Sequence, residues 1–140
     1  MRVAALDFGK VRIGLAICDE LGLMAHPRPA LDGRDRKRAI GELQRLVETE
    51  ELERFVVGIP LDSYGLPGPA ARKALAFAEE LAQATGLPVD TIDERLTTVE
   101  ATRRLREGGM DARKSRAHVD SASACILLQT WLDARRPEAR

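Results

Sequence analysis

The strongest constraint on this chain is a pair of short strand-like segments that each end at acidic residues. Residues 3–6 are apolar and are followed at once by Asp7, and residues 89–92 are followed by Asp93 and Glu94. Their length and composition are typical of buried β-strands. Strands of an open α/β sheet place their carboxyl ends at one edge, where such folds hold their functional sites. The sequence therefore predicts a sheet with carboxylates gathered at one edge.

The segments between these strands alternate in character. Gly9 lies between two apolar segments, which indicates a hairpin, and a third strand bounded by prolines is expected at a sheet edge. The expected strands cover residues 3–7, 13–18, 23–29, 55–59 and 89–92, and the expected helices cover residues 35–51, 70–85, 97–107 and 115–135. This order predicts an α/β fold: a mixed five-stranded sheet with antiparallel opening strands, flanked by helices.

The length of 140 residues fits one domain, which we expect over residues 1–136 with a frayed tail at 137–140. No apolar stretch approaches the roughly 20 residues that cross a membrane. The N-terminal apolar run is interrupted by Asp7, which is typical of a strand rather than a signal peptide. Cys18 and Cys125 lie in apolar runs, as buried thiols in a reducing compartment do. We expect a cytoplasmic protein with no membrane partner.

Charge alone does not identify a partner, because 22 basic and 22 acidic residues cancel. Basic residues do cluster at 34–38 and at 103–116. Such clusters are either solvated helix faces or contacts to phosphates, and composition leaves both interpretations open. Aromatic residues make up only 4% of the chain, so a platform of stacked bases is not its main resource.

Three acids far apart in the sequence occupy comparable places. Asp7 and Glu94 follow strands, and Asp120 lies near the start of the last helix. Three converging carboxylates would repel one another unless a cation joined them, and hard oxygen ligands suit Mg²⁺ or Mn²⁺. Such a site can hydrolyse phosphodiester bonds. Singly, Asp7 could form a turn, Asp120 could favour a helix start, and Glu94 could pair with Arg95.

Four motifs in order carry a resemblance to a known family: DFGKVRIGLAI, VGIPLDSYGLPGP, DERLTTVEA and DSASACILLQTWL. Together they resemble the YqgF family, also called RuvX, of bacterial Holliday junction resolvase-like proteins and pre-16S rRNA nucleases. The resemblance implies a ribonuclease H-like fold and a metal-dependent nuclease whose acids are Asp7, Glu94 and Asp120. Asp93 is a neighbouring acid whose role stays open.

The resemblance implies maturation of the 5′ end of the 16S rRNA precursor. Two alternatives are a Holliday junction resolvase-type DNA endonuclease and a non-catalytic factor that binds nucleic acid or assists ribosome assembly. Structured RNA is the favoured partner, branched DNA and pre-ribosomal particles are further candidates, and both a monomer and a homodimer remain open. An actin-like ATPase would need two related domains, and the Gly9-Lys10 segment lacks the glycine spacing of a phosphate-binding P-loop.

Basic residues near the acids are candidates for gripping phosphates: Lys10, Arg12, Arg95, Arg113, Lys114 and Arg116. Each also has a plain structural interpretation, and Arg95, Thr97 and Thr98 could orient Glu94 or cap the following helix. His118 could help with phosphate charge, but the interpretation as a surface residue is favoured. Tyr64 departs from the family pattern, because relatives often carry an acid there, and the segment before Asp120 holds fewer lysines than is common.

Overall fold

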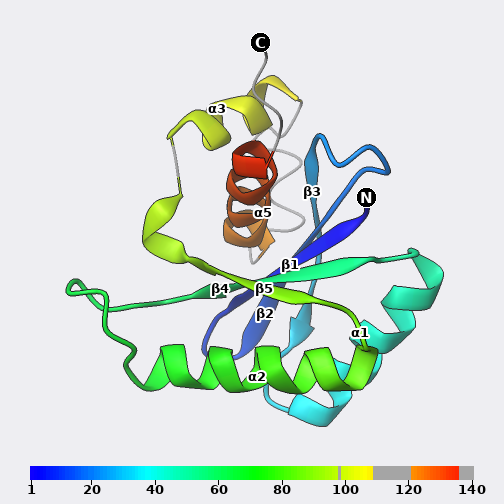
Figure 1. Ribbon diagram of the computed structural model, residues 1–140, viewed down its shortest axis with the longest axis vertical. Coiled ribbons are helices and arrows are strands. Elements are labelled where there is room, and N and C mark those ends of the chain that lie inside the picture. The colour runs from blue at the N-terminus through cyan, green and yellow to red at the C-terminus, as the bar shows by residue number, and fades with distance from the viewer. Residues whose placement is uncertain (98, 109–120, 136–140) are drawn as a thin grey trace.

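The computed structural model describes residues 1–97, 99–108 and 121–135. Its centre is one five-stranded sheet with the strand order β3-β2-β1-β4-β5 (Figure 1). The strands are β1 (Val3–Phe8), β2 (Arg12–Cys18), β3 (Ala25–Asp32), β4 (Arg54–Ile59) and β5 (Val89–Asp93). The helices are α1 (Arg36–Thr49), α2 (Pro69–Thr85), η1 (Glu94–Leu96), α3 (Val99–Glu107) and α5 (Ala122–Arg135).

The sheet is mixed, as the sequence predicts. β1, β2 and β3 pair antiparallel, whereas β4 pairs parallel with both β1 and β5. A tight turn closes the opening hairpin, where the Gly9 amide donates to the Arg12 carbonyl at 2.8 Å. β3 is an edge strand, as expected, but it continues past its prolines to Asp32. An edge strand tolerates proline because one side of its backbone forms no ladder.

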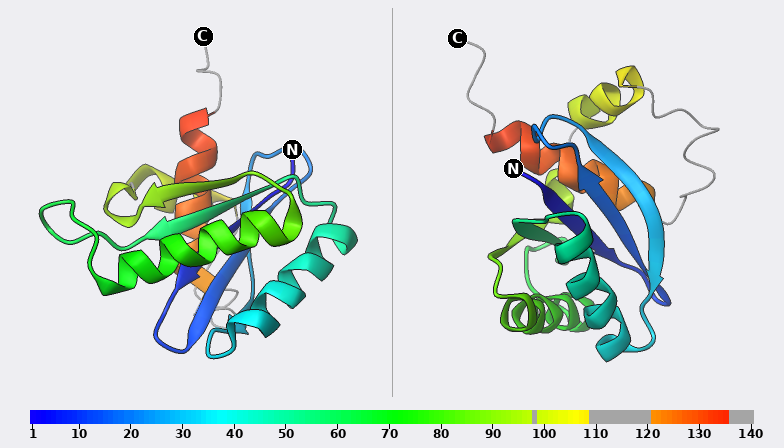
Figure 2. Two further views of the ribbon diagram at one scale, coloured as in Figure 1. Left: turned by 60° about the horizontal axis from the view of Figure 1, so that its bottom comes forward. Right: turned by 90° about the vertical axis from the view of Figure 1, so that its right-hand side faces the viewer.

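Alternation along the strands divides the core into two layers. Leu6 of β1 and Val57 of β4 face α1 and α2. Ala5 and Val56, one residue earlier on each strand, face α5. Figure 2 shows α1 and α2 together on one side of the sheet and α5 on the other. A side chain placed on the α5 face of a strand end therefore lies between the sheet and α5.

The observed helix boundary agrees closely with the predicted one at the start of α1 and differs from it at the start of α3. Asp35 caps α1, and its side chain accepts from the Arg38 amide. The helix predicted from Thr97 begins instead at Val99, because residues 94–96 form a separate 3₁₀ turn. The helix predicted over 115–135 is observed from Ala122, and residues 115–120 lie outside the described part of the chain. None of the described helices is long and apolar enough to cross a bilayer.

Two buried polar side chains connect the last helix to the sheet. Ser121 lies directly before α5 and donates to the Arg28 carbonyl while it accepts from the Leu15 amide at 3.0 Å. These partners flank the irregularity in the β2–β3 ladder. Gln129 accepts from the Ala25 amide at 2.9 Å and donates to the Leu23 carbonyl at 3.1 Å. Both side chains therefore hydrogen-bond to backbone groups of the sheet and of the turn before β3.

Candidate active site

Asp7 lies at the carboxyl end of β1 on the face that α5 covers. Val3 and Ala5 point to that face, so the alternation of the strand directs Asp7 there as well. Its partner across the hairpin is Gly14 of β2. On the other side, the pairing of β1 with β4 extends to Leu6 and Val57, and the next residue of β4 is Gly58. Asp7 therefore stands between two strand positions that carry no side chain, which opens space around its carboxylate.

Glu94 reaches this space from the end of β5. It begins the 3₁₀ turn after β5, and the Asp93 side chain caps that turn by accepting from the Arg95 amide. A Cβ atom on Gly58 would lie 2.9 Å from Glu94 Oε1, 3.1 Å from its Cγ and 2.6 Å from Leu127 Cδ1. These separations are shorter than real Cβ contacts, so the Glu94 carboxylate rests directly on the bare backbone of β4.

The Asp7 and Glu94 carboxylates form an electrostatically unfavourable pair. Burial, together with the hydrogen bond and the negative charge of Asp7, raises the pKa of Glu94 to about 8. The Oε1 atom of Glu94 is buried and accepts no hydrogen bond from the described residues. The raised pKa keeps Glu94 protonated near neutral pH, as expected for a partly buried carboxyl beside a negative charge.

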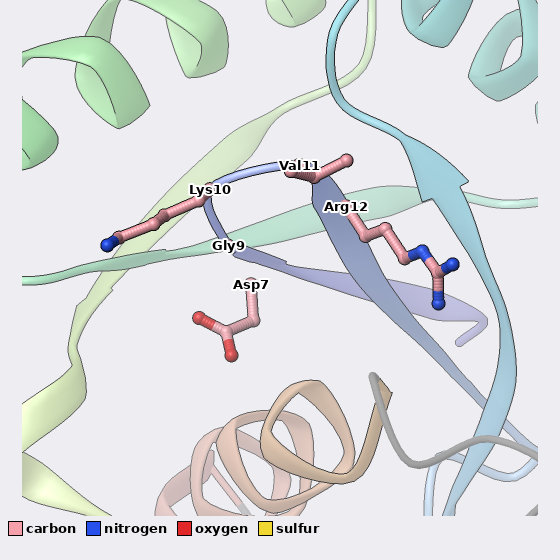
Figure 3. A pocket seen from close by; sticks show the side chains of 5 residues that line it. All are labelled: Asp7, Gly9, Lys10, Val11 and Arg12. Atoms are coloured by element: carbon pink, nitrogen blue, oxygen red, sulfur yellow. The ribbon is translucent and has the colours of Figure 1, made fainter.

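Two hollows open beside this pair. One, of about 210 Å³, lies between the strand ends and α5 and is lined by Asp7, Glu94, Thr97, Ser123, Ile126 and Leu127. The other, of about 430 Å³, lies over the hairpin turn and is lined by Asp7, Gly9, Lys10, Val11 and Arg12. Figure 3 shows Lys10 and Arg12 extending to opposite sides of the Asp7 carboxylate. Both cationic side chains border the acid that the two hollows share.

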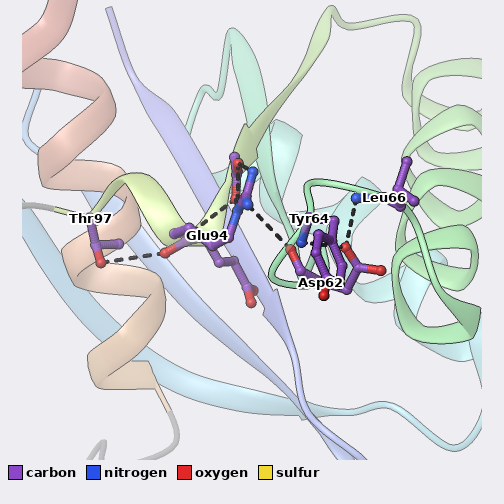
Figure 4. Close-up of polar contacts among 7 residues, drawn as sticks. Asp62, Tyr64, Leu66, Glu94 and Thr97 are labelled. Atoms are coloured by element: carbon purple, nitrogen blue, oxygen red, sulfur yellow. Dashed lines mark hydrogen bonds and ion pairs between the residues drawn. The ribbon is translucent and has the colours of Figure 1, made fainter.

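Arg95 has structural partners within the site. Its Nη2 atom lies 2.6 Å from Asp93 Oδ2, and its Nη1 atom donates to the Asp62 carbonyl at 3.2 Å. The Arg95 guanidinium lowers the pKa of Asp93. The negative charge of Asp93 is thus offset by Arg95, whereas burial and the charge of Asp7 disfavour the ionised form of Glu94. Figure 4 shows the Asp62 turn alongside Glu94, and the Thr97 hydroxyl donates to the Glu94 carbonyl at 3.4 Å.

The structure brings together only part of the predicted site. Asp7, Glu94, Lys10 and Arg12 meet at one edge, whereas Arg95 is joined to Asp93 and the neighbouring loop. Asp120, Arg113, Lys114, Arg116 and His118 lie outside the described residues. Among the described residues, no group of three potential metal ligands converges. The Asp7 and Glu94 carboxylates can nevertheless supply two oxygen ligands to a hard divalent cation.

Several residues of this site are not evident from the sequence. Ser123 and Leu127 line the smaller hollow because α5 crosses the strand ends, which no local pattern reveals. Gly58 carried a usable signal, since a glycine inside a buried strand often marks a close approach by another group. The Cβ distances at Gly58 identify Glu94 and Leu127 as those groups.

Comparison with known proteins agrees with this geometry. The family model described as "RuvX: Holliday junction resolvase" matches residues 1–134. A protein of Anaeromyxobacter sp. strain Fw109-5, named "Putative pre-16S rRNA nuclease", is 46% identical over 96% of this chain and 98% of its own length. A protein of Streptomyces avermitilis with the same name is 43% identical over 96% of this chain and 87% of its own length.

Solved structures support the fold. Thermus thermophilus RuvC in complex with a Holliday junction substrate superposes with a TM-score of 0.59 at 19% identity, covering 96% of both chains. The fowlpox virus Holliday junction resolvase superposes with a TM-score of 0.56 at 10% identity, covering 96% of this chain and 99% of its own. At these identities the likeness concerns the fold alone. With the family model matching nearly the whole length, the chain belongs to the RuvX family of nucleases and has their ribonuclease H-like fold.

Proposed function

We propose that this chain hydrolyses phosphodiester bonds in the 16S rRNA precursor, with maturation of its 5′ end as the role. The observation that carries the proposal is the half-buried pair formed by Asp7 and Glu94. Two adjacent carboxylates repel one another, so their proximity contributes no stability to a fold. Such a pair becomes functional when it binds a divalent cation next to a phosphate. The relatives named as pre-16S rRNA nucleases support the choice of substrate.

The donor set fits Mg²⁺ or Mn²⁺. Both available ligands are carboxylates. Glu94 Oε1 accepts no hydrogen bond from the described residues, so it could coordinate a cation. Asp7 and Glu94 would hold the cation from β1 and from the turn after β5, with Asp120 as the proposed third ligand. When bound, such a cation activates water and offsets charge on the phosphate. Glu94 would lose its proton on binding the cation, because metal ligation requires the ionised carboxylate.

Other residues of the chain would position the substrate. Lys10 and Arg12 border Asp7 on either side and supply positive charge for the phosphates next to the cleaved bond. We assign the same task to Arg113, Lys114 and Arg116. Arg95 would act indirectly, because its contacts with Asp93 and Asp62 fix the loop beside the site. The substrate would be encountered in the cytoplasm, as free precursor or within a pre-ribosomal particle.

Branched DNA is the second candidate substrate, because the matching family is described as Holliday junction resolvases. A resolvase cuts two strands symmetrically and is therefore expected to act as a dimer. The proposed rRNA role has no such requirement, and a monomer suffices for it.

One experiment tests these proposals together. A precursor fragment carrying the 16S 5′ end and a four-way DNA junction are incubated with the protein in Mg²⁺, Mn²⁺ or EDTA. We expect metal-dependent cleavage of the RNA that Asp7→Asn abolishes without loss of folded structure. Paired symmetric cuts in the junction, without cleavage of the RNA, would replace rRNA maturation by DNA resolution. No cleavage of either substrate by folded protein would leave a non-catalytic binding role.

A further inference from the structure

Exposed apolar side chains gather at the same edge of the sheet as the acid pair. Nine large hydrophobic side chains are exposed in the described part of the chain. Five of them lie on the segments that leave the carboxyl ends of β1, β4 and β5, namely Val11, Tyr64, Leu66, Leu96 and Val99. Single exposed hydrophobic residues are ordinary on a protein surface, but a concentration around one site indicates a contact surface.

Tyr64 is the one aromatic ring in this group, and its backbone is held firmly. The Asp62 carboxylate accepts from the Tyr64 amide at 2.9 Å and from the Leu66 amide at 2.8 Å. The Asp62 amide donates to the Leu66 carbonyl at 3.0 Å, and Gly65 closes the turn with a φ of 80°. The ring itself is 87% exposed. The turn therefore fixes the position of a side chain that contributes little to the packing of the fold.

A second set of contacts attaches this turn to the acid pair. Arg95 donates to the Asp62 carbonyl and pairs with Asp93, the residue directly before Glu94. A Cβ on Gly65 would lie 3.2 Å from Arg95 Nη2, so the guanidinium packs closely against the turn. Figure 4 shows Tyr64 on the loop next to Glu94. The ring is thus tethered to the site rather than carried on an independent loop.

We infer that Tyr64 stacks on an unpaired base of the nucleic acid next to the bond that is cleaved. This inference rests on the proposed function, and it specifies a substrate that is single-stranded or flared at the cut. Bases inside a duplex already stack on both faces and offer no surface to a ring, whereas unpaired bases do. A tyrosine on a fixed turn loses little conformational entropy on stacking. Because other aromatic residues are few, the ring acts as one contact and not as a platform.

The test measures binding in EDTA, so that cleavage does not enter. The probes are a fluorescent single-stranded RNA of about 12 nucleotides, the same RNA with one abasic nucleotide moved along it, and a duplex of equal length. The proteins are wild type, Tyr64→Ala, Tyr64→Phe and Leu75→Ala, the last an exposed hydrophobic residue on α2 that serves as the matched control. Stacking contributes about 1–3 kcal/mol per base, so we expect Tyr64→Ala to weaken binding of the single strand about 5- to 150-fold.

Further comparisons separate stacking from a general loss of affinity. Tyr64→Phe and Leu75→Ala should bind like wild type, and duplex binding should be the same for all four proteins. Removal of the contacted base should weaken wild type and leave Tyr64→Ala unchanged, as a thermodynamic cycle requires. The chain contains one tyrosine, so 3-fluorotyrosine labels this position alone. Its ¹⁹F resonance should shift with single-stranded RNA and not with duplex.

The outcomes distinguish this inference from the proposed function. RNA affinity that is equal in wild type and Tyr64→Ala, with an unmoved ¹⁹F signal, overturns the stacking role even if the wild type cleaves RNA. The ring would then be free to contact a protein partner. Tyr64-dependent binding without metal-dependent cleavage keeps the stacking role and removes the nuclease proposal. A wild type that binds none of the RNAs overturns the stacking role outright.

Discussion

The two ends of the central sheet treat charge in opposite ways. At the end where β1 and β4 begin, Glu50 accepts from Arg2 at 2.9 Å and from Arg28, and Asp90 pairs with Arg54 at 2.7 Å. At the other end, the Asp7 and Glu94 carboxylates lie together, and burial and the charge of Asp7 raise the pKa of Glu94. Asp93 at this end is paired with Arg95, so the contrast concerns Asp7 and Glu94 alone, and it supports the proposal that these two acids serve chemistry.

Replacing the central acid at the unpaired end should have the largest effect. We expect Glu94→Gln to lower the cleavage rate by at least about a thousandfold, because it removes a ligand charge at the site of reaction. The folded protein should remain, since the amide is of similar size and relieves the repulsion by Asp7. Cleavage kinetics and urea unfolding of the same preparation measure both effects. Retained activity would show that the acid pair is not the catalytic centre.

Filling the gap beneath Glu94 should have the next largest effect. Gly58→Ala places a Cβ against the Glu94 carboxylate and against Leu127, so the carboxylate must shift. Displacements of about 1 Å at a reacting centre cost about 10²-fold in rate, and we expect a loss of that order. Gly41→Ala is the matched control, because a Cβ there meets nothing within 4 Å.

The cause of that loss can be resolved with a second substitution. Leu127→Val in the Gly58→Ala background shortens the side chain that carries the 2.6 Å contact and leaves the contact to Glu94. Stability should then improve while cleavage stays low. Recovery of cleavage together with stability would assign the defect to packing against α5 rather than to the position of the carboxylate.

The raised pKa of Glu94 predicts a dependence of stability on pH in the metal-free protein. Between the ordinary value of 4.5 and about 8 the unfolded chain releases this proton while the folded chain keeps it. The free energy of unfolding should therefore fall as pH rises through this window, and the penalty should be complete above about pH 8. Glu94→Gln should lose this component, which urea unfolding in EDTA across the window measures. Parallel pH profiles of the unfolding free energy for the two proteins would contradict the raised pKa of Glu94.

The smallest effect is expected at the paired end. Glu50→Gln makes the same chemical change as Glu94→Gln but weakens the contacts to Arg2 and Arg28. These side chains are partly exposed, so we expect a loss of about 1 kcal/mol in the free energy of unfolding. Cleavage should be unaffected. A loss of cleavage comparable to that of Glu94→Gln would remove the distinction between the two ends of the sheet.

The sequence predicts the strands and the edge at which the site forms, because those depend on local periodicity. The apolar segments before Asp7 and Glu94 correctly indicate strand ends on one side of a mixed sheet. The role of Gly58 and the hydrogen bonds of Gln129 depend on which segments meet across the fold, and no local pattern contains that information. The start of α3 was misplaced by two residues because the capped turn at 94–96 interrupts the expected helix.

The polar connections of α5 also restrict movement of this helix along the surface of the sheet. The sheet surface beneath it is formed partly by small side chains, since Ala5, Ala16 and Val56 contribute to that layer, and Leu127 of the helix packs against Gly58. Small side chains interlock weakly, so these parts of the contact alone would do little to hold α5 against sliding along the sheet. Ser121 and Gln129 hold backbone groups of fixed position at two points along its length. Together they act as two pins that fix the helix in one register, and the alignment of Ser123 and Leu127 with the acid pair follows from them.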